Sequence, residues 1–190
     1  MNESHKEYLK NEMIKEALSW GKIILFAVIF ALFLNNFVIV NASVPTGSME
    51  DTIMIGDRIV AFRLSYLLDG PKRFDIVVFR YPEDESKLYV KRVIGLPGET
   101  IEIKNGKVYV NGGAVPLPDG FIKDPPNGEW GPFYVPEGRY FMLGDNRDTS
   151  ADSRKWEDGY QYVERSKILG KVIFRYFPGI KTFSEIKTEN

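Results

Sequence analysis

The sequence IEIKNGKVYV, at residues 101–110, is the clearest indication of fold in this chain. Apolar and polar residues alternate on both sides of Asn105 and Gly106, and a period of two is typical of half-buried β-strands. An Asn-Gly pair adopts positive φ at little cost, as a type I′ turn between antiparallel strands requires. The stretch therefore predicts a β-hairpin.

Short strand-like runs bounded by Gly, Pro and Asp recur on both sides of this hairpin. The segment from Gly112 to Gly138 differs, because it holds six of the 11 prolines and six of the 17 glycines. This composition predicts an ordered loop or a small irregular subdomain rather than a helix, and its aromatic residues argue against a disordered linker. The chain is therefore predicted to be mainly β. We expect strands at residues 57–62, 74–80, 88–94, 99–104, 107–110, 140–143 and 168–176.

An uncharged apolar segment, IILFAVIFALFLNNFVIV at residues 23–40, precedes these strands. With the two residues ahead of it, it reaches the roughly 20 residues that span a hydrocarbon core, and Trp20 suits the membrane interface. Four lysines precede the segment, whereas the first basic residue after it is Arg58. The positive-inside rule then places the N-terminus in the cytoplasm. We expect a cytoplasmic segment at 1–21, a single-pass transmembrane helix at 22–41 in the lipid bilayer, and an extracytoplasmic domain at 42–190.

A cleaved secretory signal is the alternative interpretation of this segment. The residues Val40, Asn41 and Ala42 resemble a small-residue cleavage site. However, the apolar stretch is longer than the usual signal-peptide core of about 7–15 residues, and a long polar segment precedes it. A retained anchor is therefore favoured.

The composition excludes several classes of protein and of site. The 25 basic and 26 acidic residues leave no cationic field for nucleic acid. The absence of Cys excludes disulfides, cysteine nucleophiles and thiolate metal sites. The single histidine, His5, lies in the predicted cytoplasmic segment, so it cannot complete a Ser-His-Asp triad on the other side of a membrane. We expect no metal, no cofactor and no nucleic-acid partner.

A serine activated by a lysine remains possible, since a buried lysine can lose its proton near neutral pH. Ser48 lies in VPTGSMEDT at residues 44–52, where Pro and two small residues suit a tight, exposed backbone. Eight residues separate it from Val40, so it works within about 29 Å of the end of the span. A plain juxtamembrane linker explains the local pattern equally well.

Two strand lysines are candidates for the base. Lys91 in LYVKRVIGLPGE and Lys171 in ILGKVIF both lie between apolar residues on a strand face. We expect Lys91 to be buried, and burial would lower its pKa. Arg92 occupies the opposite face and cannot serve as a base. The alternative for either lysine is an edge residue that prevents strand aggregation.

A third polar cluster, GDNRDTSADSR at residues 144–154, follows an apolar strand. It contains three Asp, two Arg and two Ser residues. A solvated turn with Asp/Arg pairs is one interpretation. A metal site is less favoured, because Arg147 and Arg154 would compete for the carboxylates.

These segments together resemble the type I signal peptidases of bacteria, in the short form seen in Gram-positive species. The resemblance is carried, in the family's order, by an N-terminal anchor followed by PTGSM, GDRIVA, FDIVVFRYP, YVKRVIGLPGE and GDNRDTSADSR, from Pro45 to Arg154. It implies an antiparallel β catalytic core with a β-rich insert at about 99–134. It also implies a substrate class, the signal peptides of exported preproteins with small residues at −3 and −1.

The same resemblance implies roles for particular residues. Ser48 would be the nucleophile and Lys91 the general base, and the Ser48 N–H and the Thr46 hydroxyl would form the oxyanion hole. Ser150 would orient the lysine. The surrounding ion-pair scaffold would comprise Asp145, Asp152 and Arg154.

One residue departs from the family pattern. Asp51 stands where the family usually has Pro, so the turn beyond Ser48 gains an N–H group and a carboxylate. This departure leaves open a non-catalytic, signal-peptidase-like assembly chaperone for surface proteins. A Ser-Lys autoprotease of the repressor type shares the chemistry, but it carries a DNA-binding domain in place of a membrane anchor.

Overall fold

The computed structural model describes residues 3–122 and 128–183. The chain divides into two units, residues 1–38 and residues 39–190. Part of the Pro- and Gly-rich segment at 112–138, namely residues 123–127, lies outside the described residues.

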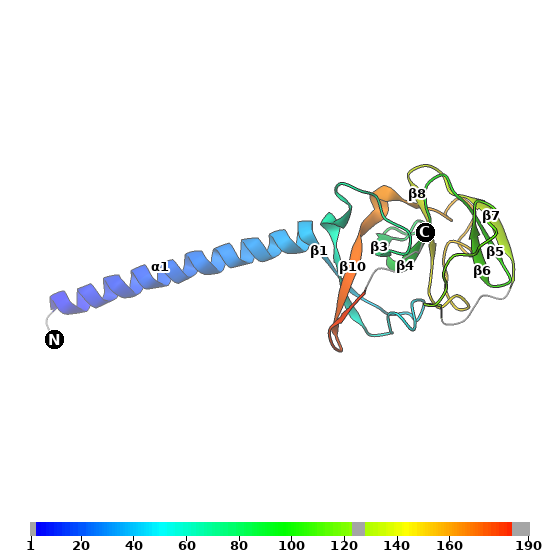
Figure 1. The fold of residues 1–190 in the computed structure, drawn as a ribbon. Coiled ribbons are helices and arrows are strands. Elements are labelled where there is room, and N and C mark those ends of the chain that lie inside the picture. Colours follow the sequence, from blue (N-terminus) through cyan, green and yellow to red (C-terminus); the bar gives the residue numbers. More distant parts are fainter. Residues whose placement is uncertain (1–2, 123–127, 184–190) are drawn as a thin grey trace. The chain divides into compact units, whose positions relative to one another are not determined.

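The first unit is a long helix, α1 (Glu3–Phe33), followed by a π-helical turn, η1 (Leu34–Val38) (Figure 1). The stretch Lys10–Val38 is long and apolar enough to cross a membrane. The predicted end of this helix at residue 41 is wrong. Residues Ile39–Ser43 form strand β1, because their backbone pairs with β2 and the Val40 side chain is buried in the core.

The second unit contains two antiparallel sheets, so the predicted mainly β fold is confirmed (Figure 1). The larger sheet has eight strands in the order β1-β2-β10-β3-β4-β8-β9, with β11 beside β10. Besides β1, the strands of this sheet are β2 (Arg58–Phe62), β3 (Ile76–Arg80), β4 (Leu88–Gly95), β8 (Arg139–Leu143), β9 (Val163–Glu164), β10 (Ile168–Phe177) and β11 (Lys181–Thr182). Short 3₁₀ helices, η2 (Arg63–Tyr66) and η3 (Arg165–Lys167), follow β2 and β9.

The smaller sheet has the order β6-β5-β7. Strands β5 (Thr100–Lys104) and β6 (Lys107–Val110) form the predicted hairpin, and Asn105 and Gly106 have the positive φ angles of 51° and 76° that its turn requires. Strand β7 (Trp130–Tyr134) pairs with β5 inside the segment expected to be irregular. Gly131 and Pro132 within it concealed this strand from the sequence pattern.

The larger sheet curls strongly. A flat sheet would separate β1 from β4 by about 19 Å, because four strand spacings lie between them. Nevertheless Val40 of β1 and Val90 of β4 belong to one hydrophobic cluster. Strand β10 carries two register irregularities on β2 and one on β3, and Gly170 lies against the backbone of Phe62 where a Cβ would overlap it. Such bulges bend a sheet, so the end of β1 comes to face the start of β4.

Candidate active site

The structure brings Ser48 and Lys91 together. Ser48 lies in the turn after β1, and Lys91 lies near the middle of β4, which pairs with β3 and β8. The Lys91 Nζ is 2.7 Å from the Ser48 Oγ and donates a second hydrogen bond, of 3.2 Å, to the Val90 carbonyl. The Lys91 residue is only 3% exposed, so its predicted burial is confirmed.

The second candidate lysine lies elsewhere. Lys171 is on β10, and its Nζ is 2.8 Å from Asp75 Oδ1. Its partner is thus a carboxylate rather than a serine hydroxyl. The structure therefore separates two lysines that the strand pattern could not distinguish.

Burial lowers the pKa of Lys91 from its ordinary value of 10.5 to about 8. The cause is desolvation, which disfavours the ammonium form. The carboxylates of Asp152 and Asp145 act in the opposite direction, but desolvation is the larger effect. A pKa near 8 gives this amine a substantial neutral fraction at neutral to mildly alkaline pH.

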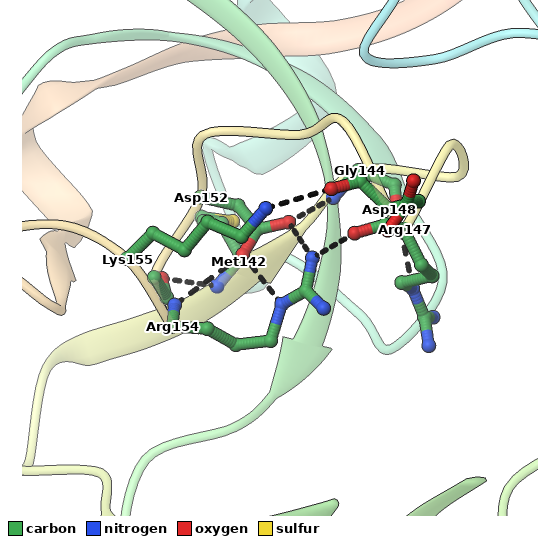
Figure 2. Close-up of polar contacts among 8 residues, drawn as sticks. Met142, Gly144, Arg147, Asp148, Asp152, Arg154 and Lys155 are labelled. Atoms are coloured by element: carbon green, nitrogen blue, oxygen red, sulfur yellow. Dashed lines mark hydrogen bonds and ion pairs between the residues drawn. The ribbon is translucent and has the colours of Figure 1, made fainter. Parts of the chain in front are cut away.

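Both carboxylates are already paired with an arginine. Asp145 accepts hydrogen bonds from Arg92 at 2.8 and 2.5 Å, and Thr52 Oγ1 donates to it at 2.6 Å. Asp152 accepts two hydrogen bonds from Arg154 (Figure 2), and their lengths are 2.8 and 2.9 Å. All four charged side chains are buried. Bidentate pairing leaves little net negative charge from these carboxylates to stabilise a protonated Lys91.

A third arginine adds positive charge to this cluster. Arg147 is 1% exposed, and its Nε donates to the Gly144 carbonyl at 3.0 Å (Figure 2). Burial and the nearby Arg154 lower the pKa of Arg147 to about 10. The Arg147 carbonyl accepts a 2.5 Å hydrogen bond from Arg154 Nη2. The scaffold thus holds three guanidinium groups against two carboxylates.

Ser150 lies beside the nucleophile but does not bind the lysine in this structure. Its Oγ is buried without a hydrogen-bond partner. A Cβ at Gly144 would overlap both the Ser150 side chain and the Ser48 carbonyl, so these groups surround Gly144 closely. The expected hydrogen bond between Ser150 and Lys91 is absent among the described residues, where Lys91 binds Ser48 and the Val90 carbonyl.

A pocket of about 330 Å³ opens at Ser48 and Lys91. Thr46 is exposed and lines this pocket together with Gly47 and Ser48. Asp51, the residue that departs from the family pattern, is exposed. The apolar lining of the pocket comes from β1, the start of β4 and two loops, and comprises Ala42, Val44, Pro45, Met49, Leu88, Val90 and Ala151.

Several residues of this site were not predicted from the sequence. Arg92 was placed on the face opposite Lys91, and a buried arginine requires a carboxylate partner. The sequence could therefore have indicated that Arg92 has an acidic partner, but not that this partner is Asp145. Asn146 is buried, and its side chain binds the Gly47 carbonyl at 3.1 Å. No local pattern indicated this contact, because 99 positions separate the two residues.

Comparisons with known proteins place this chain in a family. The family model described as signal peptidase, peptidase S26, matches residues 17–177. A probable signal peptidase I-2 of Synechocystis is 41% identical over 167 residues, which cover 85% of this chain and 73% of the relative. A signal peptidase I of Bacillus licheniformis is 32% identical over 197 residues, covering 98% of each chain.

A crystal structure of a signal peptidase I from Enterococcus faecalis V583 is 33% identical, covers 53% of this chain and 95% of its own, and has a TM-score of 0.45. The family assignment rests on the family model and on the sequence relatives, which span most of this chain. The chain therefore belongs to the signal peptidase family, peptidase S26, and is a serine endopeptidase.

Proposed function

We propose that this protein is a membrane-anchored endopeptidase that removes signal peptides from exported preproteins after small residues at −3 and −1. Ser48 is the nucleophile and Lys91 the general base. The observation that carries this assignment is the 2.7 Å distance from the Ser48 Oγ to the Nζ of a lysine that is 3% exposed. A non-catalytic assembly chaperone would have no use for a buried lysine at this distance.

The chemistry follows from these two groups. Neutral Lys91 accepts the hydroxyl proton as the Ser48 Oγ attacks the scissile carbonyl carbon. The developing oxyanion is stabilised by the Ser48 N–H and the Thr46 hydroxyl. Lys91 then returns the proton to the leaving amine, which departs as the new N-terminus and leaves an acyl-enzyme. Lys91 next takes a proton from the water that attacks the ester carbonyl, and gives this proton to the Ser48 Oγ as the C–Oγ bond breaks. The signal peptide leaves with a C-terminal carboxyl group, and the Ser48 hydroxyl is restored.

The pocket suits an extended substrate with small side chains. Strand β1 lies at the edge of the larger sheet, and residues Ala42 and Ser43 at its end line the pocket. An extended peptide can add to such an edge by main-chain hydrogen bonds. A shallow apolar pocket accepts alanine and excludes bulkier side chains at −1 and −3.

The charged cluster serves this chemistry as a positioning scaffold. The pair Arg92–Asp145 holds the loop at 144–154 against β4, and the pair Arg154–Asp152 links two residues within that loop. Breaking a buried pair by removing one partner typically costs about 3–5 kcal/mol of stability. Ser150, whose buried Oγ has no hydrogen-bond partner, is the residue proposed to orient Lys91 once a substrate displaces the present hydrogen bonds. No metal or cofactor enters the mechanism.

The N-terminal unit is the proposed membrane anchor. The span falls within Lys10–Val38, where helix α1 and the turn η1 are long and apolar enough to cross a bilayer. Four lysines precede its most apolar part, which favours a cytoplasmic N-terminus and an extracytoplasmic catalytic unit. Such a placement puts the catalytic unit on the side of the membrane to which preproteins are exported.

Cleavage of a model preprotein in detergent tests the proposed function. The full chain should release a product whose new N-terminus follows a small-x-small sequence, as N-terminal sequencing would show. Replacement of the −1 Ala of the substrate by Phe should lower kcat/KM at least about 100-fold, because the pocket cannot accommodate the ring. A folded wild-type protein that cuts no preprotein in trans would instead support the chaperone.

A further inference from the structure

Asn146 contacts the backbone on both sides of the proposed nucleophile. Its side-chain Nδ2 donates to the Gly47 carbonyl at 3.1 Å, and its backbone N–H donates to the Ser48 carbonyl at 3.1 Å. The residue is only 5% exposed. These two carbonyls belong to the peptide units before and after Ser48, so one residue fixes both planes that meet at the Ser48 Cα.

The hydrogen bond to the Gly47 carbonyl also determines the direction in which the Ser48 N–H points. The Gly47 C=O and the Ser48 N–H belong to one planar trans unit, in which the two groups point in opposite directions. The Gly47 carbonyl is held by the Asn146 side chain and also by the Glu50 N–H, at 3.2 Å. The Ser48 N–H must therefore point away from Asn146.

The Ser48 N–H is also available to a substrate. Among residues 3–122 and 128–183 it donates to no protein acceptor, and Ser48 lines the pocket together with Thr46. A backbone donor with no internal partner at a pocket wall suits an oxyanion that forms there.

We propose that Asn146 is a positioning residue that orients the Ser48 N–H toward the oxyanion. This inference rests on the proposed function, in which Ser48 is the nucleophile. The carboxamide touches no reacting atom and acts through the Gly47–Ser48 peptide. Without its Nδ2 donor this peptide keeps only the 3.2 Å hydrogen bond from the Glu50 N–H. The N–H is then less firmly directed into the pocket when the tetrahedral intermediate forms.

The Asn146→Asp and Asn146→Ala variants of the full chain test this inference. Loss of an oxyanion donor typically lowers kcat about 10²–10³-fold; a donor that is misdirected rather than lost should lower it about 10- to 100-fold. KM should stay within about threefold, because the ground-state carbonyl needs the donor less than the oxyanion does. A residue that merely holds the loop would change stability and KM as well.

A matched control is available in the small sheet. Asn111 is exposed, and its Oδ1 accepts a hydrogen bond from the Thr100 N–H at 2.8 Å, which Asp can also accept. Asn111→Asp should leave both kcat and KM unchanged. Ser48→Ala is measured in the same assay, because it distinguishes a failure of the inference about Asn146 from a failure of the proposed function. If Ser48→Ala is inactive while both Asn146 variants keep wild-type kcat, the inference about Asn146 fails and the proposed function stands; an active Ser48→Ala would overturn both.

A peptide aldehyde ending in Ala supplies a second readout. Its hemiacetal with Ser48 places an oxygen where the oxyanion forms, so the Asn146 variants should bind it about 10- to 100-fold more weakly. Their affinity for the corresponding peptide alcohol, which cannot form this adduct, should be unchanged. If the variants lose equal affinity for the aldehyde and for the alcohol, Asn146 determines the shape of the pocket rather than the orientation of the Ser48 N–H.

Should neither Asn146 variant fold, NMR of the wild-type protein decides. The Ser48 amide proton should move downfield when the aldehyde binds, while the Asn146 side-chain amide protons exchange slowly in the free and bound states. An unmoved Ser48 amide proton, or rapidly exchanging Asn146 protons, would overturn the inference.

Discussion

Replacement of Ser48 by Ala should abolish preprotein cleavage. The substitution removes the hydroxyl oxygen that lies 2.7 Å from the Lys91 Nζ and that is the proposed nucleophile. Removing the nucleophile of a serine protease typically lowers kcat about 10⁶-fold, so we expect a loss of at least about 10⁴-fold. The measurement is single-turnover cleavage of a labelled preprotein by the full chain in detergent, compared with the wild type.

Folding must be intact for this loss to be informative. Ser48→Ala deletes one small, half-buried hydroxyl, and its thermal unfolding midpoint should match that of the wild type closely. Ser86→Ala is a matched control, because Ser86 is exposed and its hydroxyl binds only the neighbouring Asp84. Cleavage by Ser48→Ala at more than about one-hundredth of the wild-type rate would exclude Ser48 as the nucleophile.

Replacement of Lys91 by Met should have an effect of similar size. Met fills the volume of the lysine stem but cannot accept the Ser48 proton, so we expect kcat to fall at least about 10⁴-fold, as it does when one member of a catalytic unit is lost. Arg at this position should be equally inactive, since a guanidinium stays protonated. The inactivity of Lys91→Arg would show that the position needs a base rather than a positive charge.

Lys171 offers a control with the same local pattern. It lies on a strand between apolar residues, but its Nζ binds Asp75 at 2.8 Å. Lys171→Met should keep kcat within about threefold and lower the unfolding midpoint, because it leaves the buried Asp75 carboxylate without this partner. An active Lys91→Met, or an inactive but folded Lys171→Met, would contradict the assignment of the base.

Much of the fold follows from local sequence. The seven strands expected from alternation all occur, and their ends are correct to within two residues. The hairpin around Asn105 was predictable because its turn needs two positive φ angles that Asn-Gly adopts readily. The missed strands are the short β9 and β11, the Gly- and Pro-containing β7, and β1, whose residues continue the apolar run of the helix. Their strand structure depends on pairing partners, which local pattern does not reveal.

The residues of the site could be predicted from local sequence less well than the strands could. Alternation placed Lys91 and Lys171 in equivalent settings, and only the curl of the sheet and the loop at 144–154 make them different. Resemblance to a family, rather than periodicity, selected Ser48 and Lys91. The contacts of Asn146 with Gly47 and of Arg92 with Asp145 span 99 and 53 positions. They arise from tertiary packing, which no window of sequence contains.

The charged scaffold is consistent with the proposed role of Lys91 as the general base. Burial alone disfavours the ammonium form of Lys91, whereas an unpaired carboxylate nearby would restore it. Arg92 binds Asp145 and Arg154 binds Asp152, each through two hydrogen bonds, so the negative charge of the two carboxylates is largely balanced. The buried Arg147 adds a further positive charge to this cluster.

The pKa of Lys91 is the most direct test of this mechanism. It can be measured by NMR titration of the lysine side chains in the full chain, with Lys91→Met identifying the resonance. A pKa of about 8 is expected, and kcat/KM should then rise about tenfold per pH unit below pH 8 and level off above it, since only the neutral amine accepts the Ser48 proton. A pKa near 10.5 in both the free enzyme and the enzyme bound to a peptide aldehyde would contradict the assignment of Lys91 as the general base.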